Sequence, residues 1–438
     1  MEEKTEAKQD KLSRVAFVFS EGELVQRTWI ISLLQCLVPY FSVDLLTEYP
    51  AEVSIEGVTN HYAHPHAINN ESKPIIPVGV RKCIKKIPLV YYLLKTIRLH
   101  LVQKLVQIYR KKKGIGPLYR HVHGLPQWGT PEFVSLVVQR CTLQLCDAVI
   151  AVDVKELIIC HQVVTEVPII YYSFELFYRG HPEFFPRHLA PLKDAEAIAF
   201  KDVAAVIIQD EERARFLWQD NQRPYEPEKV ILFPVSYMGQ AAVRRSDYFR
   251  TLYPELARQR VLVQMGNITK CRRSNELIEK AATCPEQYAM IFHGFADEFT
   301  RRAFESNHLI RCRLSQPVPF WDVEKVAAGA DIGLVFYFDN NFNDRLIAHA
   351  SATFAMFMKC GVPVLAGNVG SLSRIVRQYN CGIVVEDLAD LFRAADQIMA
   401  DYDTYSNNAV RCFEGEHQLK HYCKNLIDRL KELCECSR

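Results

Sequence analysis

Short apolar runs alternate with segments of helical periodicity along the first half of the chain. The run at residues 14–19 is followed by a helical pattern at 25–37 and by a second apolar run at 43–47. Continuous apolar runs of this length are typical of buried parallel strands, so this order predicts a strand–helix–strand unit. The same alternation continues toward the middle of the chain. Further predicted strands span residues 147–152, 167–172, 204–208 and 229–233, with predicted helices at 155–163, 191–201 and 211–218.

A second cycle of the same pattern begins near residue 260. The sequence therefore predicts an α/β protein with two Rossmann-like, doubly wound domains that face each other across a cleft. We expect an N-terminal domain of residues 1–240, a C-terminal domain of residues 241–415 and a C-terminal helix at 416–438. Ligands of such sheets bind beyond the carboxyl ends of the strands, so the cleft is the expected site. Predicted strands lie at 260–265, 288–292, 331–336, 362–366 and 381–385, and predicted helices at 274–282, 321–328, 352–359, 388–402 and 417–434.

The segment from Ser72 to Pro131 interrupts this pattern and contains no Asp or Glu. It carries thirteen basic residues around the apolar stretch 89–94. A basic, apolar helix with aromatic residues is typical of a segment at an anionic membrane surface. The alternative is a core helix with a solvated basic rim. We therefore expect residues 81–113 to contact an anionic membrane or to cover the domain.

The overall composition is that of an ordinary globular protein. The 438 residues are 49% hydrophobic and 24% charged, and the formal net charge is +2. This balance argues against a dedicated nucleic-acid binder. No apolar run is long enough for a membrane-spanning helix, and no apolar core of a secretory signal follows the charged N-terminus. We therefore expect a cytoplasmic protein, peripheral on the membrane surface at most, with reduced cysteines.

Common nucleotide and hydrolase motifs are absent. The chain has no GxxxxGK[ST], GxSxG or HExxH, and no GxGxxG follows either opening strand. Its only DxD lies at residues 401–403, on a predicted helix. The C-terminal region offers either a zinc site or a helix that carries thiols; we favour the helix and predict neither a metal nor a cofactor. The residues of that possible zinc site are His417, His421, Cys423, Cys434 and Cys436.

Two stretches in the second half carry candidate chemistry. In the first, a predicted strand ends at Gly266 and leads into a loop with Lys270, Arg272 and Arg273. Cations in one loop can neutralise a diphosphate, although a solvated basic loop is the plain alternative. In the second, Ser351 and Thr353 stand where a helix begins. Free N–H groups and the helix dipole favour an anion there, and this role is compatible with N-capping by Ser351.

These stretches resemble the donor-binding domain of nucleotide-sugar glycosyltransferases with two Rossmann-like domains, the GT-B architecture. The chain is most similar to the large retaining family known as "glycosyl transferases group 1". Residues 360–366, CGVPVLA, resemble its CG-x-PV-x-A element, and Gly370 with residues 380–384 resembles the glycine loop and strand that follow. Residues 147–153 and 168–176 resemble its acceptor domain, so the resemblance spans roughly residues 14–415.

Several positions depart from the family pattern. Ala348 and Met356 occupy the positions of two glutamates that bind a donor sugar hydroxyl and the donor ribose in the family. Asn267 replaces the usual arginine, and Arg272–Arg273 replaces Lys-Gly. Phe174 replaces the histidine of a His-Glu-Leu element, whereas Glu175 is kept. The resemblance therefore implies a divergent member whose donor and stereochemistry are open.

The resemblance implies transfer of a sugar from a nucleotide diphosphate-sugar to an acceptor hydroxyl, with retention and without metal. The basic segment suggests that the acceptor is a glycan that is lipid-linked or close to a membrane. If the enzyme inverts instead, it needs a general base, and the candidates are Glu175, His121, His123 and Asp153. The expected catalytic residues are Lys270, Arg272 and Glu175; the donor-binding residues are Gly266, Asn267, Arg273, Gly294, Ser351 and Thr353; the acceptor-binding residues are Gly22, Arg27, His121 and His123.

Three other functions stay open from the sequence. A sugar-nucleotide 2-epimerase shares the two-domain architecture. An inactive glycosyltransferase-like subunit would explain the missing glutamates at Ala348 and Met356. A basic module that binds membrane surfaces would explain residues 72–131 but not the loops that resemble a donor site.

Overall fold

The computed structural model describes most of both predicted domains. The described residues are 12–21, 24, 27–51, 53–64, 129–141, 146–164, 166–179, 190–306 and 311–436. Gly22, His121 and His123, which we expected to bind the acceptor, lie outside these residues. The same holds for the basic segment 81–113 and its predicted membrane contact.

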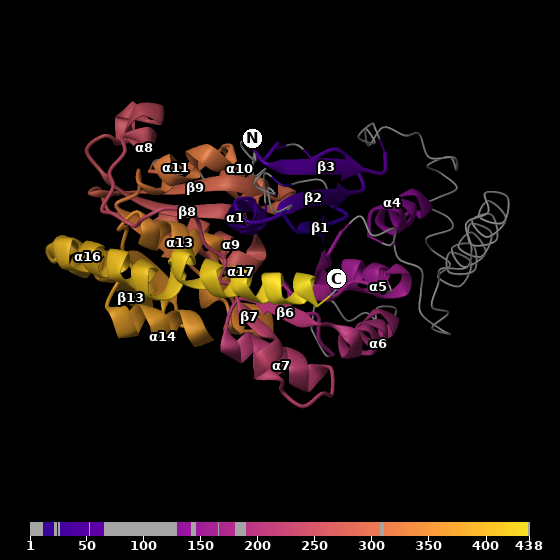
Figure 1. Ribbon diagram of the computed structural model, residues 1–438. Helices are drawn as coiled ribbons and strands as arrows, with labels where there is room; N and C mark the ends of the chain where they lie inside the picture. Colours follow the sequence, from indigo (N-terminus) through magenta and orange to yellow (C-terminus); the bar gives the residue numbers. More distant parts are fainter. Residues whose placement is uncertain are drawn as a thin grey trace, which may run out of the picture.

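The first half of the chain forms a parallel sheet of seven strands within the described residues, in the order β3-β2-β1-β4-β5-β6-β7 (Figure 1). The central strand β4 is buried along its whole length, which explains its continuous apolar sequence. The strands are β1 Arg14–Val18, β2 Ser42–Thr47, β3 Val58–Tyr62, β4 Ala148–Val152, β5 Ile169–Tyr172, β6 Ala205–Ile208 and β7 Val230–Leu232. The helices are α1 Thr28–Leu37, α4 Pro131–Cys141, α5 Asp153–Val163, α6 Ala190–Ala199 and α7 Glu211–Asp220.

The second half forms another parallel sheet, with six strands in the described residues and the order β10-β9-β8-β11-β12-β13. Two Rossmann-like halves are therefore present, and the predicted fold class is confirmed. The strands are β8 Arg260–Ile268, β9 Tyr288–Ala296, β10 Cys312–Ser315, β11 Ile332–Val335, β12 Val364–Gly367 and β13 Gly382–Val385. The helices are α8 Tyr248–Leu252, α9 Ser274–Ala281, α10 Glu298–Ser306, α11 Val323–Ala327, α12 Phe342–Arg345, α13 Ala352–Lys359, α14 Gly370–Tyr379, α15 Leu391–Ala400 and α16 Tyr402–Cys412.

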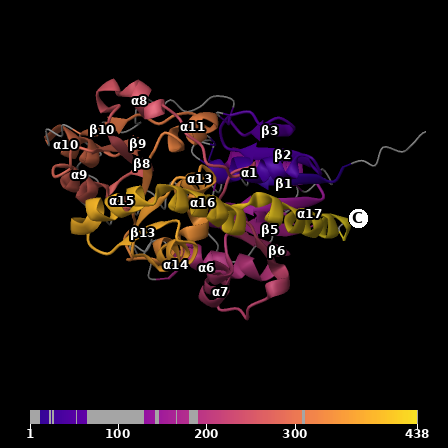
Figure 2. The same cartoon turned by 90° about the vertical axis from the view of Figure 1, so that its left-hand side faces the viewer.

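The C-terminal helix α17 (Leu419–Glu435) returns to the first domain. Figures 1 and 2 show α16 beside the second domain and α17 continuing across to the first. Leu426 and Leu430 of α17 are fully buried in the same core cluster as Leu34 of α1. The structure also joins Cys36 of α1 to Cys423 of α17 by a disulfide, with a Cα–Cα distance of 6.1 Å. This pairing differs from the expectation that all cysteines are reduced.

None of the helices in the described part of the chain combines the length and the apolar composition needed to cross a bilayer.

Candidate functional site

A cavity of about 260 Å³ lies between the two domains, where the carboxyl ends of their strands meet. Arg27, Trp29, Phe174, Glu175 and Arg213 line it from the first domain. The second domain contributes residues near the carboxyl ends of β8 and β9, the loop after β8 and the first turn of α13. They include Gly266, Asn267, Arg272, His293, Gly294 and Thr353. The cavity therefore gathers seven residues that the sequence predicted for the site: Arg27, Glu175, Gly266, Asn267, Arg272, Gly294 and Thr353.

Two glycines stand opposite each other on β8 and β9. Gly266 pairs with Gly294 in the parallel register, and both have positive φ, +99° and +141°. A Cβ on Gly294 would lie 1.9 Å from the carbonyl oxygen of Gly266, so only glycine fits there. The Thr353 hydroxyl donates a hydrogen bond to the Met265 carbonyl at 3.2 Å. This bond ties the first turn of α13 to the end of β8.

The three predicted cations of the β8–α9 loop have different environments. The Arg272 guanidinium lines the cavity and lies 4.1 Å from the centre of the Tyr337 ring. Lys270 is exposed and does not line the cavity. Arg273 has a left-handed backbone, and its Nε donates to Glu276 Oε2 at 2.6 Å. The loop therefore brings only Arg272 of these three cations into the cavity.

Ser351 caps helix α13 rather than lining the cavity. Its hydroxyl accepts a hydrogen bond from the Phe354 N–H at 3.2 Å, which confirms the predicted N-cap. The same hydroxyl lies 2.7 Å from the Tyr337 hydroxyl. Because Tyr337 packs under the Arg272 guanidinium, Ser351 supports the position of that cation from behind.

Glu175 carries the only carboxylate among the described residues that line the cavity. The Glu175 side chain is accessible from the cleft, but the walls of the cleft enclose it on its other sides. This enclosure raises the pKa of Glu175 above its ordinary value, although the charges of Arg213 and Arg272 act in the opposite direction. Arg27 opposes the shift as well, and its Nη2 donates to exposed Glu21 at 2.5 Å. The cavity thus combines one carboxylate with three guanidinium groups.

Arg213 is a site residue that sequence reasoning missed. Its guanidinium is buried and donates to the carbonyl of Phe174 at 2.7 Å and to Asn343 Oδ1 at 3.1 Å. Burial lowers the pKa of Arg213, while neighbouring carboxylates oppose this. In the sequence Arg213 is one of several charged residues on an amphipathic helix, so no local signal marks it.

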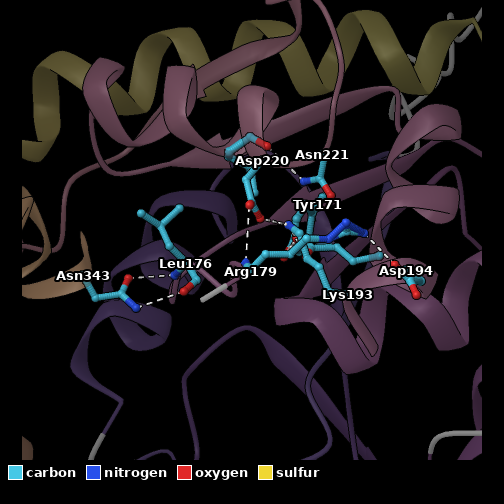
Figure 3. A network of polar contacts seen from close by, with 10 residues as sticks. Tyr171, Leu176, Arg179, Lys193, Asp194, Asp220, Asn221 and Asn343 are labelled. Atoms are coloured by element: carbon cyan, nitrogen blue, oxygen red, sulfur yellow. Dashed lines mark hydrogen bonds and ion pairs between the residues drawn. The ribbon is translucent and has the colours of Figure 1, made fainter. Parts of the chain in front are cut away.

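Residues of the second domain hold the loop that follows β5. Asn343 of α12 accepts from the Leu176 N–H at 2.8 Å and donates to the Leu176 carbonyl at 3.0 Å (Figure 3). On the side of the first domain, the Arg179 N–H donates to Asp220 Oδ1 at 3.4 Å. Buried Lys193 in turn contacts Asp220 Oδ2 at 2.5 Å. The loop carrying Glu175 is therefore fixed from both domains.

Asp153 lies behind this loop and does not line the cavity. Its Oδ1 accepts from the N–H groups of Phe174 and Glu175, at 2.9 and 3.2 Å. The Phe174 ring stacks on Trp29, with centroids 4.0 Å apart and an interplanar angle of 6°.

The positions of the family glutamates contribute nothing to the cavity. Ala348 and Met356 are buried in the hydrophobic core of the second domain. His293, which the sequence did not single out, lines the cavity and lies 3.0 Å from the Ser315 hydroxyl through Nδ1. Burial lowers the pKa of His293 to about 4, so the ring is neutral near pH 7. In the described part of the chain, no three His, Cys, Asp or Glu side chains gather as a metal site.

Solved structures with the same architecture define the class of this fold. HepE from Anabaena, solved in complex with UDP-glucose, is 12% identical with a TM-score of 0.63, over 96% of this chain and all of HepE. Sucrose-phosphate synthase from Thermosynechococcus elongatus is 14% identical with a TM-score of 0.63, over 97% of this chain and 100% of that one. WaaG, a glycosyltransferase involved in lipopolysaccharide biosynthesis, is 14% identical with a TM-score of 0.56, over 94% and 98% of the two chains. The chain has the GT-B fold of these proteins.

Part of the second domain also matches a known protein family in sequence. Residues 308–428 match the family described as "Glucosyltransferase 3-like, C-terminal domain". No curated protein matches the chain in sequence. The chain is thus a divergent GT-B protein whose C-terminal part is glucosyltransferase-like.

Proposed function

We propose that the protein transfers a sugar from a nucleotide diphosphate-sugar to an acceptor hydroxyl. The observation that carries this proposal is the cavity between the sheets, where Arg272 faces the cleft beside the Gly266–Gly294 pair. A uridine nucleotide is the first donor to test, because HepE, which shares the fold, was solved with UDP-glucose.

The difficult part of this reaction is the leaving diphosphate. Negative charge grows on its oxygen as the bond to the anomeric carbon breaks, and a preorganised cation stabilises that charge. Arg272 supplies the cation, while the backbone at Gly266 and the first turn of α13 supply N–H groups without side chains in the way. We propose that this suffices without a metal ion, so transfer should survive EDTA.

We propose retention of the anomeric configuration. The acceptor oxygen would bond to the anomeric carbon on the face from which the diphosphate leaves, and the acceptor proton would pass to the leaving phosphate. Glu175 then orients the acceptor and balances the charge of the arginines around it. In an inverting reaction Glu175 would be the general base. The configuration of the product, read by NMR, separates the two.

An inactive glycosyltransferase-like subunit is the second candidate function. The observation that favours it is the burial of Ala348 and Met356, which leaves the second domain without a carboxylate among the described lining residues. Such a protein would bind a nucleotide without turnover.

The decisive experiment incubates the protein with a panel of nucleotide sugars, with and without simple sugar acceptors, and measures free nucleotide diphosphate. We expect release that depends on acceptor and continues in EDTA. An isomerised donor would indicate an epimerase. Binding of UDP by calorimetry without any release would indicate the inactive subunit. Arg272→Ala serves as the control for site-specific turnover.

We also propose, from the composition of residues 81–113 alone, that the acceptor is presented at an anionic membrane. Vesicle co-sedimentation of the wild type and of a variant with Gln at Lys111, Lys112 and Lys113 tests this. Binding should require anionic lipid and weaken as salt rises. Equal sedimentation of both proteins at all salt concentrations would refute it.

A further inference from the structure

The first turn of α5 contacts the main chain of two different loops at the cleft. Asp153 Oδ1 accepts both the Phe174 and the Glu175 N–H, in the loop after β5. Glu156 Oε1 accepts the Ser20 N–H at 3.0 Å and also contacts the Ser20 hydroxyl, in the loop after β1. Helix α5 follows β4, which lies between β1 and β5 in the sheet. Helix α5 therefore begins between the segments that follow β1 and β5, at the carboxyl ends of these strands.

The backbone at Asp153 is shaped for this contact. Its φ is +58°, the left-handed region that non-glycine residues other than Asn and Asp rarely adopt. With this backbone, Asp153 bonds to the neighbouring loop, and its side chain does not cap α5, which begins without a side-chain cap. Residues held in such conformations cluster at functional sites, where the surrounding structure maintains them.

A single carboxylate oxygen makes both contacts of Asp153. That oxygen can accept two N–H bonds whether or not the other oxygen carries a proton. Burial raises the pKa of Asp153 to about 8, although the two N–H bonds oppose this. Because Phe174 is stacked on Trp29, the same bonds fix an aromatic pair together with Glu175.

We propose that Asp153 is a positioning residue for sugar transfer: its Oδ1 fixes the main chain at Phe174 and Glu175, and so fixes where the Glu175 carboxylate stands in the cleft. Glu156 Oε1 likewise accepts from the main chain at Ser20, shortly after β1. Neither acid touches the reacting atoms. This inference rests on the proposed function.

The test compares two substitutions at Asp153. Asp153→Asn keeps an oxygen acceptor and tolerates the left-handed backbone, so kcat should stay near that of the wild type. Asp153→Gly also suits this backbone but removes the acceptor. It should speed hydrogen exchange of the Phe174 and Glu175 amides and lower kcat by about 10- to 100-fold, as displaced catalytic groups do. The donor KM should change little, since the donor contacts lie in the other domain.

Asp147→Gly is the matched control. Asp147 Oδ2 accepts the Arg14 N–H at 2.8 Å, so it also ties a carboxylate to the main chain of a neighbouring strand. It directly precedes β4, at the amino-terminal ends of the strands, whereas the cleft lies at their carboxyl ends. The control should lose thermal stability but keep kcat. If Asp153→Gly does not fold, Asp153→Ser takes its place: its shorter side chain does not reach both N–H groups, so it should lower kcat several-fold with the donor KM unchanged.

The outcomes separate the inference from the proposed function. Faster exchange with unchanged kcat in Asp153→Gly would overturn the positioning role. Asp153→Asn as inactive as Asp153→Gly would also overturn it, because the acceptor oxygen would then be insufficient. A wild type that transfers no sugar from any donor would overturn the proposed function itself. The exchange measurement, which needs no turnover, would still report whether Asp153 holds the loop.

Discussion

His349 joins three parts of the chain through two carboxylates, and its removal should change how stability depends on pH. Its Nδ1 lies 3.6 Å from Asp210 of the first domain, and its Nε2 lies 2.9 Å from Glu416, just before the C-terminal helix. Burial alone would lower the pKa of His349, but these two acids raise it to about 9. The histidine is therefore charged near neutral pH.

The size of the effect follows from this pKa. The difference between 6.5 in the unfolded chain and about 9 in the folded one corresponds to roughly 3 kcal/mol, at about 1.4 kcal/mol per pH unit. A raised histidine pKa means that the folded chain holds the proton more tightly. The stabilisation is thus complete below about pH 6.5 and disappears as the pH rises through about 9.

The variant His349→Gln cannot carry this charge and leaves Asp210 and Glu416 without a cation between them. At pH 6.5 its Tm should lie about 6–12 °C below that of the wild type, since about 1 kcal/mol changes Tm by about 2–4 °C in a domain of this size. The two curves should converge toward pH 10. Scanning calorimetry from pH 6.5 to 10 measures the two Tm curves. Burial lowers the pKa of His417, so its charging affects stability only below this pH range.

A control separates this effect from the loss of any histidine. His61 contacts one carboxylate, Asp44, at 3.1 Å on the edge strand β3. Because His61→Gln leaves His349 in place, it should keep the steeper alkaline decline of the wild type. Parallel Tm curves for the wild type and His349→Gln across the whole range would refute the reasoning.

Three further predictions concern the donor side of the cavity. Arg272→Ala should lower kcat/KM at least about 10-fold with little change in Tm, because a charge-assisted contact is worth roughly 1.5–3 kcal/mol, and the loss in Lys270→Ala should be smaller; equal losses would contradict a special role for Arg272. Gly294→Ala should cost about 1–3 kcal/mol and weaken UDP binding in calorimetry, because its Cβ would collide with the Gly266 carbonyl; unchanged binding would refute this. Arg273→Gly should raise Tm slightly with kcat/KM unchanged, because removing the strain of the left-handed backbone, about 1 kcal/mol, more than offsets the lost ion pair with Glu276. A lower kcat/KM would instead reveal a donor contact.

The strands in the middle of each sheet were predictable to within a few residues, as were the edge strands β7 and β13, whereas the edge strands β3 and β10 were not. β4 was predicted at 147–152 and observed at Ala148–Val152, because a strand covered on both faces needs apolar residues throughout. β3 and β10 have the sequences VTNHY and CRLS, with half-exposed positions. They lie at the edges of their sheets, where solvent covers part of each strand and no apolar run is required.

The candidate site was predictable where a loop follows a strand. Gly266, Gly294 and Glu175 come one to three residues after predicted strands, and a parallel fold collects such positions at the carboxyl ends of its strands. Arg213 and His293 were missed because each belongs to a helix or strand whose pattern explains it without a ligand. Only the tertiary structure shows that they face the cavity. Which of three adjacent cations enters the cavity depends on the turn at Arg273, and the sequence does not encode that locally.

Because the two family glutamates are absent, the carboxylate that lines the cavity in the described part of the chain comes from the first domain and not from the second. With Ala348 and Met356 in the core, Glu175 is the one carboxylate among the described lining residues, and it stands on the wall that the first domain contributes. Its position depends on contacts from both domains, because Asn343 forms two hydrogen bonds with the main chain of Leu176, and Asp153 accepts a hydrogen bond from the N–H of Glu175 itself. A change in the angle between the domains would therefore move this carboxylate relative to Arg272.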